Sequence, residues 1–280
     1  MPGCYDALTA ALIEQSGFRA AVLSGASIAY TRLGLPDIGL VSAAEVVDVV
    51  ATIRDRVPDL PLLVDADNGF GNALNVQRTV RTFERAGASA LLLEDQAAPK
   101  RCGHLTGKRL ISAAEMCGKL RAAVDAREHA ATLIVARTDA VGVEGFAAAM
   151  DRAALYVDAG ADLLFVEAPQ SIEQMREICA VFGNRVPLVA NMVEGGATPI
   201  SSMDDLAHMG FRVVLFPGAA VRVITAALRE FFADLERDGS SRAWAGRMLD
   251  LKGLNALLGT DAILDAGQRY DQSITAADIM

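Results

Sequence analysis

The sequence PLLVDAD at residues 61–67 joins an apolar run of strand length directly to two carboxylates. LLLED at 91–95 repeats this arrangement, and IVARTD at 134–139 ends a third run with charged side chains. The apolar runs themselves cover 61–64, 90–93 and 132–136, and four more lie at 20–23, 162–166, 186–190 and 212–216. Runs of this length, rich in Val, Leu or Ile, predict buried β-strands.

Longer amphipathic segments separate the seven runs. They cover 43–56, 75–86, 113–127, 146–159, 172–182, 203–209 and 219–237, and they predict helices. Ser42 and Ser112 stand at N-cap positions, and Glu45 and Glu115 follow three residues later as in a capping box. Strands that alternate with helices predict a parallel sheet, either open and doubly wound or closed into a barrel.

Polar residues at the strand ends favour the closed barrel. They follow six successive strands, as Ser24-Gly25, Asp65-Ala66-Asp67, Glu94-Asp95, Arg137-Thr138-Asp139, Glu167 and Asn191. An open sheet gathers its ligand groups at one switch point, whereas a barrel gathers them from many strands around one axis. We therefore predict an α/β fold of the (β/α)₈ TIM-barrel type, as a single domain over 1–280. The eighth strand should precede Cys4, so it is either a stub or trimmed from the start.

Composition excludes several classes of protein. The chain of 280 residues carries a net charge of −9, which argues against a nucleic-acid surface. No apolar run reaches the length of a membrane span, and the first ten residues lack the pattern of a signal peptide. The four cysteines form no C-x-x-C pair, so we expect neither a disulfide framework nor a zinc knuckle. A reducing, cytoplasmic setting is the expectation.

Carboxylates gather at the predicted strand ends. Asp65, Asp67 and Glu94 follow two neighbouring strands, and Asp37 lies in a loop after an earlier strand. Clustered carboxylates repel one another and need a cation. Oxygen ligands select Mg²⁺, with Mn²⁺ as the alternative, and Mg²⁺ takes few direct carboxylates. We predict that Asp65 binds the ion directly and that the other three act largely through water.

A basic loop, PKRCGHLTGKR at 99–109, stands out in this acidic chain. Its two glycines and its place after a strand predict a mobile loop above the barrel mouth. The cationic neighbours should favour the thiolate of Cys102, and Lys100 among them should attract an anionic substrate. Cys102 on such a loop can deliver a proton to an enolate, and His104 is its candidate partner.

A carboxylate substrate also needs anchors. Arg137 at a strand end can bind a carboxylate through two parallel hydrogen bonds. Asn191 and the loop 195–199, which includes Thr198, can supply further donors. The backbone N–H groups of Ser24, Gly25 and Ala26 can stabilise a developing oxyanion.

Together these motifs resemble the isocitrate lyase/phosphoenolpyruvate mutase superfamily. The resemblance runs from about residue 5 to 232. It rests on SG at 24–25, LGLPD at 33–37, DADNG at 65–69, EDQ at 94–96, KRCGH at 100–104, ARTDA at 136–140 and NMVEGG at 191–196. It implies a (β/α)₈ barrel whose C-terminal helical extension, about 238–280, is exchanged between subunits of a homotetramer. It also implies Asp65 as the direct Mg²⁺ ligand, with Asp37, Asp67 and Glu94 in the outer shell.

The resemblance further implies a role for the thiol. The loop is similar to that of the C–C lyases of this superfamily, which cleave a 2-hydroxy di- or tricarboxylate such as 2,3-dimethylmalate or 2-methylisocitrate to a 2-oxo acid. Cys102 then protonates the enolate, and Arg137, Glu167 and Asn191 belong to the substrate site. The predicted catalytic residues are Cys102, His104, Arg137 and Glu167.

Two positions depart from the methylisocitrate lyase pattern. Val22 stands where those enzymes have a Tyr proposed as a base, and FPGA at 216–219 replaces a Pro-Leu-Ser turn. The general base is therefore unassigned. The alternatives are a carboxyphosphonoenolpyruvate-type phosphonomutase, which shares the thiol loop, an oxaloacetate hydrolase, and a barrel that only binds metabolites.

Overall fold

A computed structural model describes residues 1–271 and contains eight parallel strands in sequential order. Each strand pairs with the next along the chain, and a bridge between Pro2 and Phe216 joins the last strand to the first. The strands are β1 (Gly3–Cys4), β2 (Ala21–Leu23), β3 (Leu62–Asp65), β4 (Ala90–Glu94), β5 (Leu133–Thr138), β6 (Leu163–Val166), β7 (Leu188–Asn191) and β8 (Val213–Leu215). The predicted closed (β/α)₈ barrel is confirmed.

The eighth strand is the two-residue stub β1. The Gly3 N–H donates to the Phe216 carbonyl at 3.0 Å, and the Phe216 N–H donates to the Met1 carbonyl at 3.0 Å. A Cβ on Gly3 would overlap the Pro217 backbone, so only glycine fits at this seam. The first strand is therefore short, as one of the two sequence-based alternatives expected.

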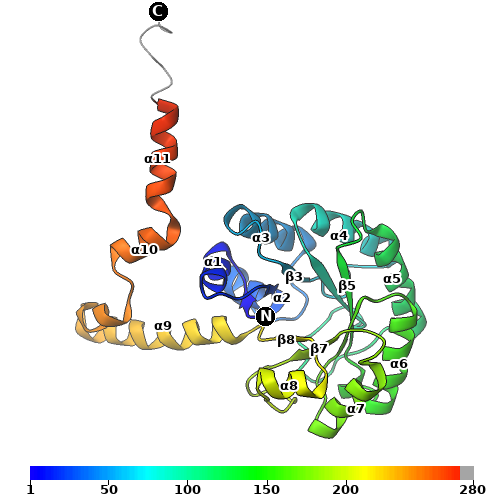
Figure 1. Cartoon of the computed structure of the whole chain (residues 1–280). Helices are drawn as coiled ribbons and strands as arrows, with labels where there is room; N and C mark the ends of the chain where they lie inside the picture. The colour runs from blue at the N-terminus through cyan, green and yellow to red at the C-terminus, as the bar shows by residue number, and fades with distance from the viewer. Residues whose placement is uncertain (272–280) are drawn as a thin grey trace, which may run out of the picture. The chain divides into compact units, whose positions relative to one another are not determined.

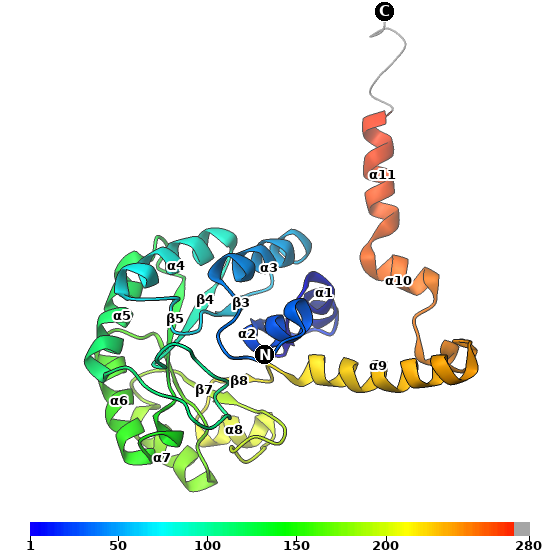
Figure 2. The same cartoon turned by 180° about the vertical axis from the view of Figure 1, so that it is seen from behind.

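Helices cover the outside of the barrel (Figure 1) and form a continuous outer layer from α3 to α7 when seen from behind (Figure 2). Those of the barrel are α1 (Ala7–Gln15), α2 (Gly25–Ile28), α3 (Ala43–Arg56), α4 (Ala73–Ala86), α5 (Ala113–Ala126), α6 (Phe146–Asp158), α7 (Ile172–Phe182) and α8 (Met203–Met209). The predicted capping box of Ser42 and Glu45 is present. None of these helices, nor any other within 1–271, is long and apolar enough to cross a bilayer.

The strands alternate between two apolar layers. Leu62 and Val64 of β3 pack outward against the helices, whereas Leu63 joins a separate cluster inside the barrel. Its other members include Val22, Leu92 and Phe165, each from a different strand. Because successive side chains of a strand point to opposite faces, this register fixes which polar residues face the barrel axis.

The chain divides into two compact units after Arg222. The second unit contains α10 (Leu251–Leu258), α11 (Thr260–Asp271) and most of α9 (Ala219–Asp238). Trp244 is its buried centre: the indole N–H donates to Asp234 at 2.8 Å, and Phe231 meets the ring edge-on. The predicted extension from about 238 falls in this unit, and its last residues, 272–280, lie outside the described chain. Its exchange between subunits stays a prediction.

Candidate active site

The side chains of the site continue the inward register of the barrel strands. Two residues beyond Leu63 comes Asp65, and two beyond Leu92 comes Glu94. The same step leads from Val22 to Ser24, from Val135 to Arg137, from Phe165 to Glu167 and from Val189 to Asn191. All six residues line one cavity of about 380 Å³. The predicted residues that line this cavity are Ser24, Ala26, Asp37, Asp65, Glu94, Lys100, Cys102, His104, Arg137, Glu167 and Asn191.

Lys100 partly neutralises the acidic side of the cavity. Its Nζ lies 2.5 Å from Asp37 Oδ1 and 2.7 Å from Asp67 Oδ1, and the Lys100 side chain is only 6% exposed. Lys100 lines the cavity as predicted, but its ammonium contacts carboxylates of the chain. The four carboxylates outnumber it, so the group still favours a further cation.

Two buried oxygens in this group lack hydrogen bonds. Within residues 1–271, Glu94 Oε1 has no hydrogen-bond partner, and Asp67 Oδ1 meets Lys100 without hydrogen-bond alignment. In the same range, no group of three or more Asp, Glu, His or Cys side chains is close enough together to hold a metal ion without further ligands. Mg²⁺ retains several waters and binds one or two carboxylates, so the residues present fit that ion.

The acidic group predicts a pH dependence of stability. Burial raises the pKa of Asp67 to about 7, and Asp65 adds to the rise while Lys100 opposes it. The folded state therefore binds this proton more tightly than the unfolded state does, so stability falls as pH rises from about 4 to 7. We expect the urea midpoint in EDTA to be lower at pH 8 than at pH 5. In Asp67→Asn the difference between the urea midpoints at pH 5 and pH 8 should be smaller. A midpoint that rises with pH in the parent protein would contradict the raised pKa of Asp67.

Arg137 is the centre of the opposite side. Its guanidinium donates to both Asp139 oxygens, at 2.9 and 3.0 Å, and lies 3.4 Å from Glu94 and 3.9 Å from Glu167. Its charge also lies over the Phe165 ring, 5.4 Å from the centroid. Although burial opposes it, these three carboxylates raise the pKa of Arg137, which stays charged.

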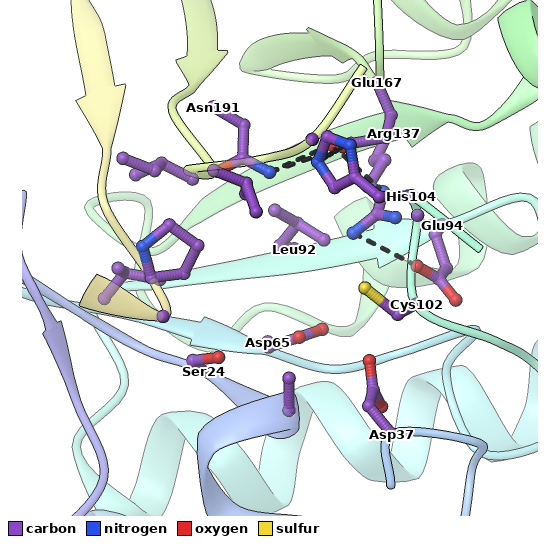
Figure 3. A pocket seen from close by; sticks show the side chains of 18 of the residues that line it. Ser24, Asp37, Asp65, Leu92, Glu94, Cys102, His104, Arg137, Glu167 and Asn191 are labelled. Carbon is purple, nitrogen blue, oxygen red and sulfur yellow. Dashed lines mark hydrogen bonds and ion pairs between the residues drawn. The ribbon is translucent and has the colours of Figure 1, made fainter. Parts of the chain in front are cut away.

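Cys102 lies between Asp37 and Asp65 on the acidic side of the cavity and Arg137 on the opposite side (Figure 3). Its N–H donates to the Asp37 carbonyl at 3.1 Å, which holds the loop over the acidic side. Burial raises the pKa of the Cys102 thiol and outweighs the lowering by Arg137 and by the His104 backbone N–H. The predicted thiolate is therefore corrected: the thiol is kept neutral, because desolvation disfavours the charged form.

His104 contacts Glu167 rather than the thiol through its ring. Its Nε2 lies 2.9 Å from Glu167 Oε1, and its Nδ1 accepts from the Ala197 N–H at 3.2 Å. Asn191 donates to Glu167 at 3.3 Å. The expected partnership with Cys102 is thus made by the His104 backbone, and the imidazole joins the loop to the β6 and β7 ends.

Three predicted site residues lie elsewhere. Thr198 is buried beside a separate void of about 10 Å³ behind Asn191, so it does not face the main cavity. The Gly25 N–H donates to Asp65 Oδ2 at 3.3 Å, so it orients that carboxylate. Asp67 contacts Lys100 and does not line the cavity.

The sequence interpretation missed Arg222 and Asp139. Arg222 lines the cavity from the start of α9 and donates to the Glu194 carbonyl at 2.6 Å. Its place just after β8 was the signal that could have identified it. Asp139 closes the motif that carries Arg137, at a spacing that suits an intramotif ion pair.

The backbone is unusual where the site is built. Asp67 and Ala168 adopt left-handed conformations, with φ of 46° and 58°, a region that favours glycine. Ala168 directly follows Glu167, so this bend helps to aim the Glu167 carboxylate at His104 and Asn191.

A (β/α)₈ barrel with acidic and basic side chains gathered at the carboxyl ends of its strands is the architecture of an α/β-barrel enzyme. Comparison with family models matches residues 1–236 to "Phosphoenolpyruvate phosphomutase". The chain belongs to this phosphoenolpyruvate mutase family.

Similar proteins of known activity include lyases and a mutase. The chain is 48% identical to the 2-methylisocitrate lyase of Aeropyrum pernix, over 86% of this chain and 76% of the relative. It is 38% identical to the 2,3-dimethylmalate lyase of Eubacterium barkeri, over 96% and 92%. It is 40% identical to the chloroplastic carboxyvinyl-carboxyphosphonate phosphorylmutase of Arabidopsis thaliana, over 96% and 80%.

Solved structures agree in fold. A 2,3-dimethylmalate lyase superposes with a TM-score of 0.90 at 34% identity, covering 96% of this chain and 89% of that one. An oxaloacetate acetylhydrolase with 3,3-difluorooxalacetate superposes at 0.89 and 32%, covering 95% and 91%. A phosphonopyruvate hydrolase with oxalate and Mg²⁺ superposes at 0.85 and 29%, covering 96% and 93%.

Proposed function

We propose that this protein is a Mg²⁺-dependent C–C lyase that cleaves a small 2-hydroxy di- or tricarboxylate, such as 2,3-dimethylmalate or 2-methylisocitrate, to a 2-oxo acid. One observation carries the proposal: the Cys102 thiol, on a loop, and the carboxylates at the strand ends line the same cavity. The similarity to 2-methylisocitrate and 2,3-dimethylmalate lyases supports it.

Substrate binding is assigned to the cationic and amide groups of the cavity. Arg137 presents a fixed positive charge to a substrate carboxylate, and Asn191 and the Ala26 N–H add donors. Because Asp139 fixes the guanidinium through two hydrogen bonds, Arg137 reaches the substrate with little loss of conformational freedom.

The bond-breaking step is a retro-aldol cleavage. The substrate hydroxyl gives its proton to a general base, to which no residue is assigned, the C2–C3 bond breaks, and its electron pair passes to C3 as a carboxylate-stabilised enolate. The Cys102 thiol gives its proton to C3, and C2 becomes the carbonyl of the 2-oxo acid. A thiol kept neutral by burial is in the correct protonation state for this role.

Mg²⁺ would be held by Asp65, with Asp37, Asp67 and Glu94 acting through water, and Mn²⁺ is the alternative ion. When bound, it supplies charge stabilisation to the oxygen that becomes the 2-oxo group.

Asp65→Asn tests the metal assignment. Loss of one carboxylate charge should weaken Mg²⁺ binding at least tenfold by calorimetry, because hard cations bind charged oxygen ligands best. EDTA should abolish turnover, and added Mg²⁺ should restore it. Asp55→Asn, an exposed change on α3, is the matched control and should bind Mg²⁺ as the parent does. Equal affinity in Asp65→Asn would remove Asp65 from the metal site.

A substrate panel tests the reaction. We expect 2,3-dimethylmalate or 2-methylisocitrate with Mg²⁺ to release pyruvate, measured with a coupled lactate dehydrogenase assay. Release of oxalate from oxaloacetate would instead identify a hydrolase. A P–C product in phosphorus NMR would identify a phosphonomutase. If no compound of the panel reacts and none binds, the lyase proposal fails.

The assembly and location are part of the same proposal. From the family resemblance we propose a cytoplasmic homotetramer built from pairs that exchange the C-terminal extension. Its partner molecules are small carboxylates, with neither nucleic acid nor membrane involved.

A further inference from the structure

Lys108 is a buried cation that the proposed chemistry does not use. It lies on the same loop as Cys102, five residues beyond Gly103, and its side chain is only 3% exposed. Its ammonium donates to the Gly103 carbonyl and, at 2.9 Å, to Asp139 Oδ1. One side chain therefore joins the loop beside the thiol to the residue that follows β5.

Asp139 links Lys108 to Arg137, because its carboxylate contacts both side chains. Its two oxygens accept from the Arg137 guanidinium, and its N–H donates to the buried Asp95 at 2.9 Å. Asp95 in turn accepts from the Tyr156 hydroxyl of α6 at 2.7 Å. The backbone of Asp139 is thus held by Asp95, while its carboxylate accepts hydrogen bonds from Lys108 and Arg137.

Gly103 sits directly against Arg137. A Cβ at Gly103 would overlap Arg137 Nη2, so the loop backbone and the guanidinium are in contact here. Any shift of the Gly103 carbonyl moves Cys102, its neighbour, relative to Arg137. The contacts of Lys108 therefore affect the distance between the Cys102 thiol, which is the proposed proton donor, and Arg137, which is the proposed substrate-binding residue.

We propose that Lys108 is a positioning residue, whose contacts with Gly103 and Asp139 hold the Cys102 thiol over the cavity and fix the orientation of Arg137. This rests on the proposed function in so far as Cys102 is the proton donor. The N-terminal part of the loop has a different contact: the Gln96 side chain bonds to the Arg101 backbone at 2.8 and 2.9 Å. Lys108 holds the side that faces Arg137.

Lys108→Met tests the proposal, since it keeps the length of the side chain and removes the ammonium. Asp139 retains Arg137 in this variant, so no buried carboxylate is left unpaired and we expect the protein to fold. Arg109→Met is the matched control: Arg109 is the next residue, it is exposed, and its guanidinium donates to the Ala98 carbonyl at 3.3 Å. Lys108→Arg is the conservative variant.

The kinetic readout is the split between kcat and KM. A small displacement of a reacting group can cost about 100-fold in rate. We expect Lys108→Met to lower kcat about 100-fold and to raise KM less than tenfold. Lys108→Arg should recover at least tenfold of the loss, and Arg109→Met should stay within about twofold of the parent.

The second readout does not need activity. Alkylation of Cys102 by iodoacetamide, followed by peptide mapping, should be at least tenfold faster in Lys108→Met, with buried Cys4, Cys117 and Cys179 as internal controls. If Lys108→Met does not fold, Lys108→Gln takes its place with the same expectation.

The outcomes separate this proposal from the proposed function. Faster alkylation in a protein without lyase activity would keep the positioning role and reject the lyase. Lyase activity with an unchanged kcat, or an unchanged alkylation rate, in Lys108→Met would overturn the positioning role.

Discussion

Replacing Cys102 by serine is expected to lower kcat by a factor of about 10² to 10⁴ and to leave substrate affinity within a few-fold, because a general acid contributes about that factor. The alcohol is a much weaker acid than the thiol, so the enolate would wait for a proton from water. The thiol lies between the acidic side of the cavity and Arg137 (Figure 3), where a substrate held by Arg137 would be within its reach.

Single-turnover assays measure this effect apart from product release. Cys117→Ser is the control, since that thiol is buried on α5 and donates to the Leu155 carbonyl at 3.6 Å, outside the cavity. It should turn over within about twofold of the parent. Full turnover in Cys102→Ser would show that another group delivers the proton.

Replacing Arg137 by methionine is expected to abolish turnover and to lower the free energy of unfolding by about 3–5 kcal/mol, because a buried charge loses its partner. Within residues 1–271, Glu94 would keep no ion pair, while Asp139 would keep Lys108. Burial already raises the pKa of Glu94, so the variant should lose less stability at pH 5, where Glu94 can take up a proton.

Urea denaturation in EDTA measures this loss without a contribution from bound metal. The control is Arg185→Met, which removes an exposed ion pair with Asp158 and should cost no more than about 1 kcal/mol. A loss below that size in Arg137→Met would mean that the carboxylates around Arg137 are hydrated or protonated at neutral pH.

The barrel could be predicted because its signals are local. The alternation of Leu62, Leu63 and Val64, and the cap formed by Ser42 and Glu45, lie within a few residues of one another. The strand β1 carries no such signal, because two residues are too short for a period. It is defined by its pairing with β2 and Phe216, contacts made with distant parts of the chain.

The candidate site was predictable to the same extent. Its strand-end residues follow from register, since Asp65, Glu94 and Glu167 each continue an inward alternation. The ion pairs between loop and barrel do not follow from spacing: Lys100 meets Asp37 and Asp67 only after the loop folds over. Burial of Cys102 by the same packing reversed the expected direction of its pKa.

Ala168, the residue with left-handed backbone after Glu167, shows how accuracy can be gained without a net loss of stability. Its Cβ costs the folded chain on the order of 1 kcal/mol in this conformation. Glycine would remove that cost but would give the unfolded chain more freedom, a penalty of similar size. The two effects nearly cancel, and what distinguishes alanine is a narrower range of backbone angles beside the carboxylate. At this position, selection for an accurately oriented Glu167 carboxylate can therefore act almost independently of selection for thermal stability.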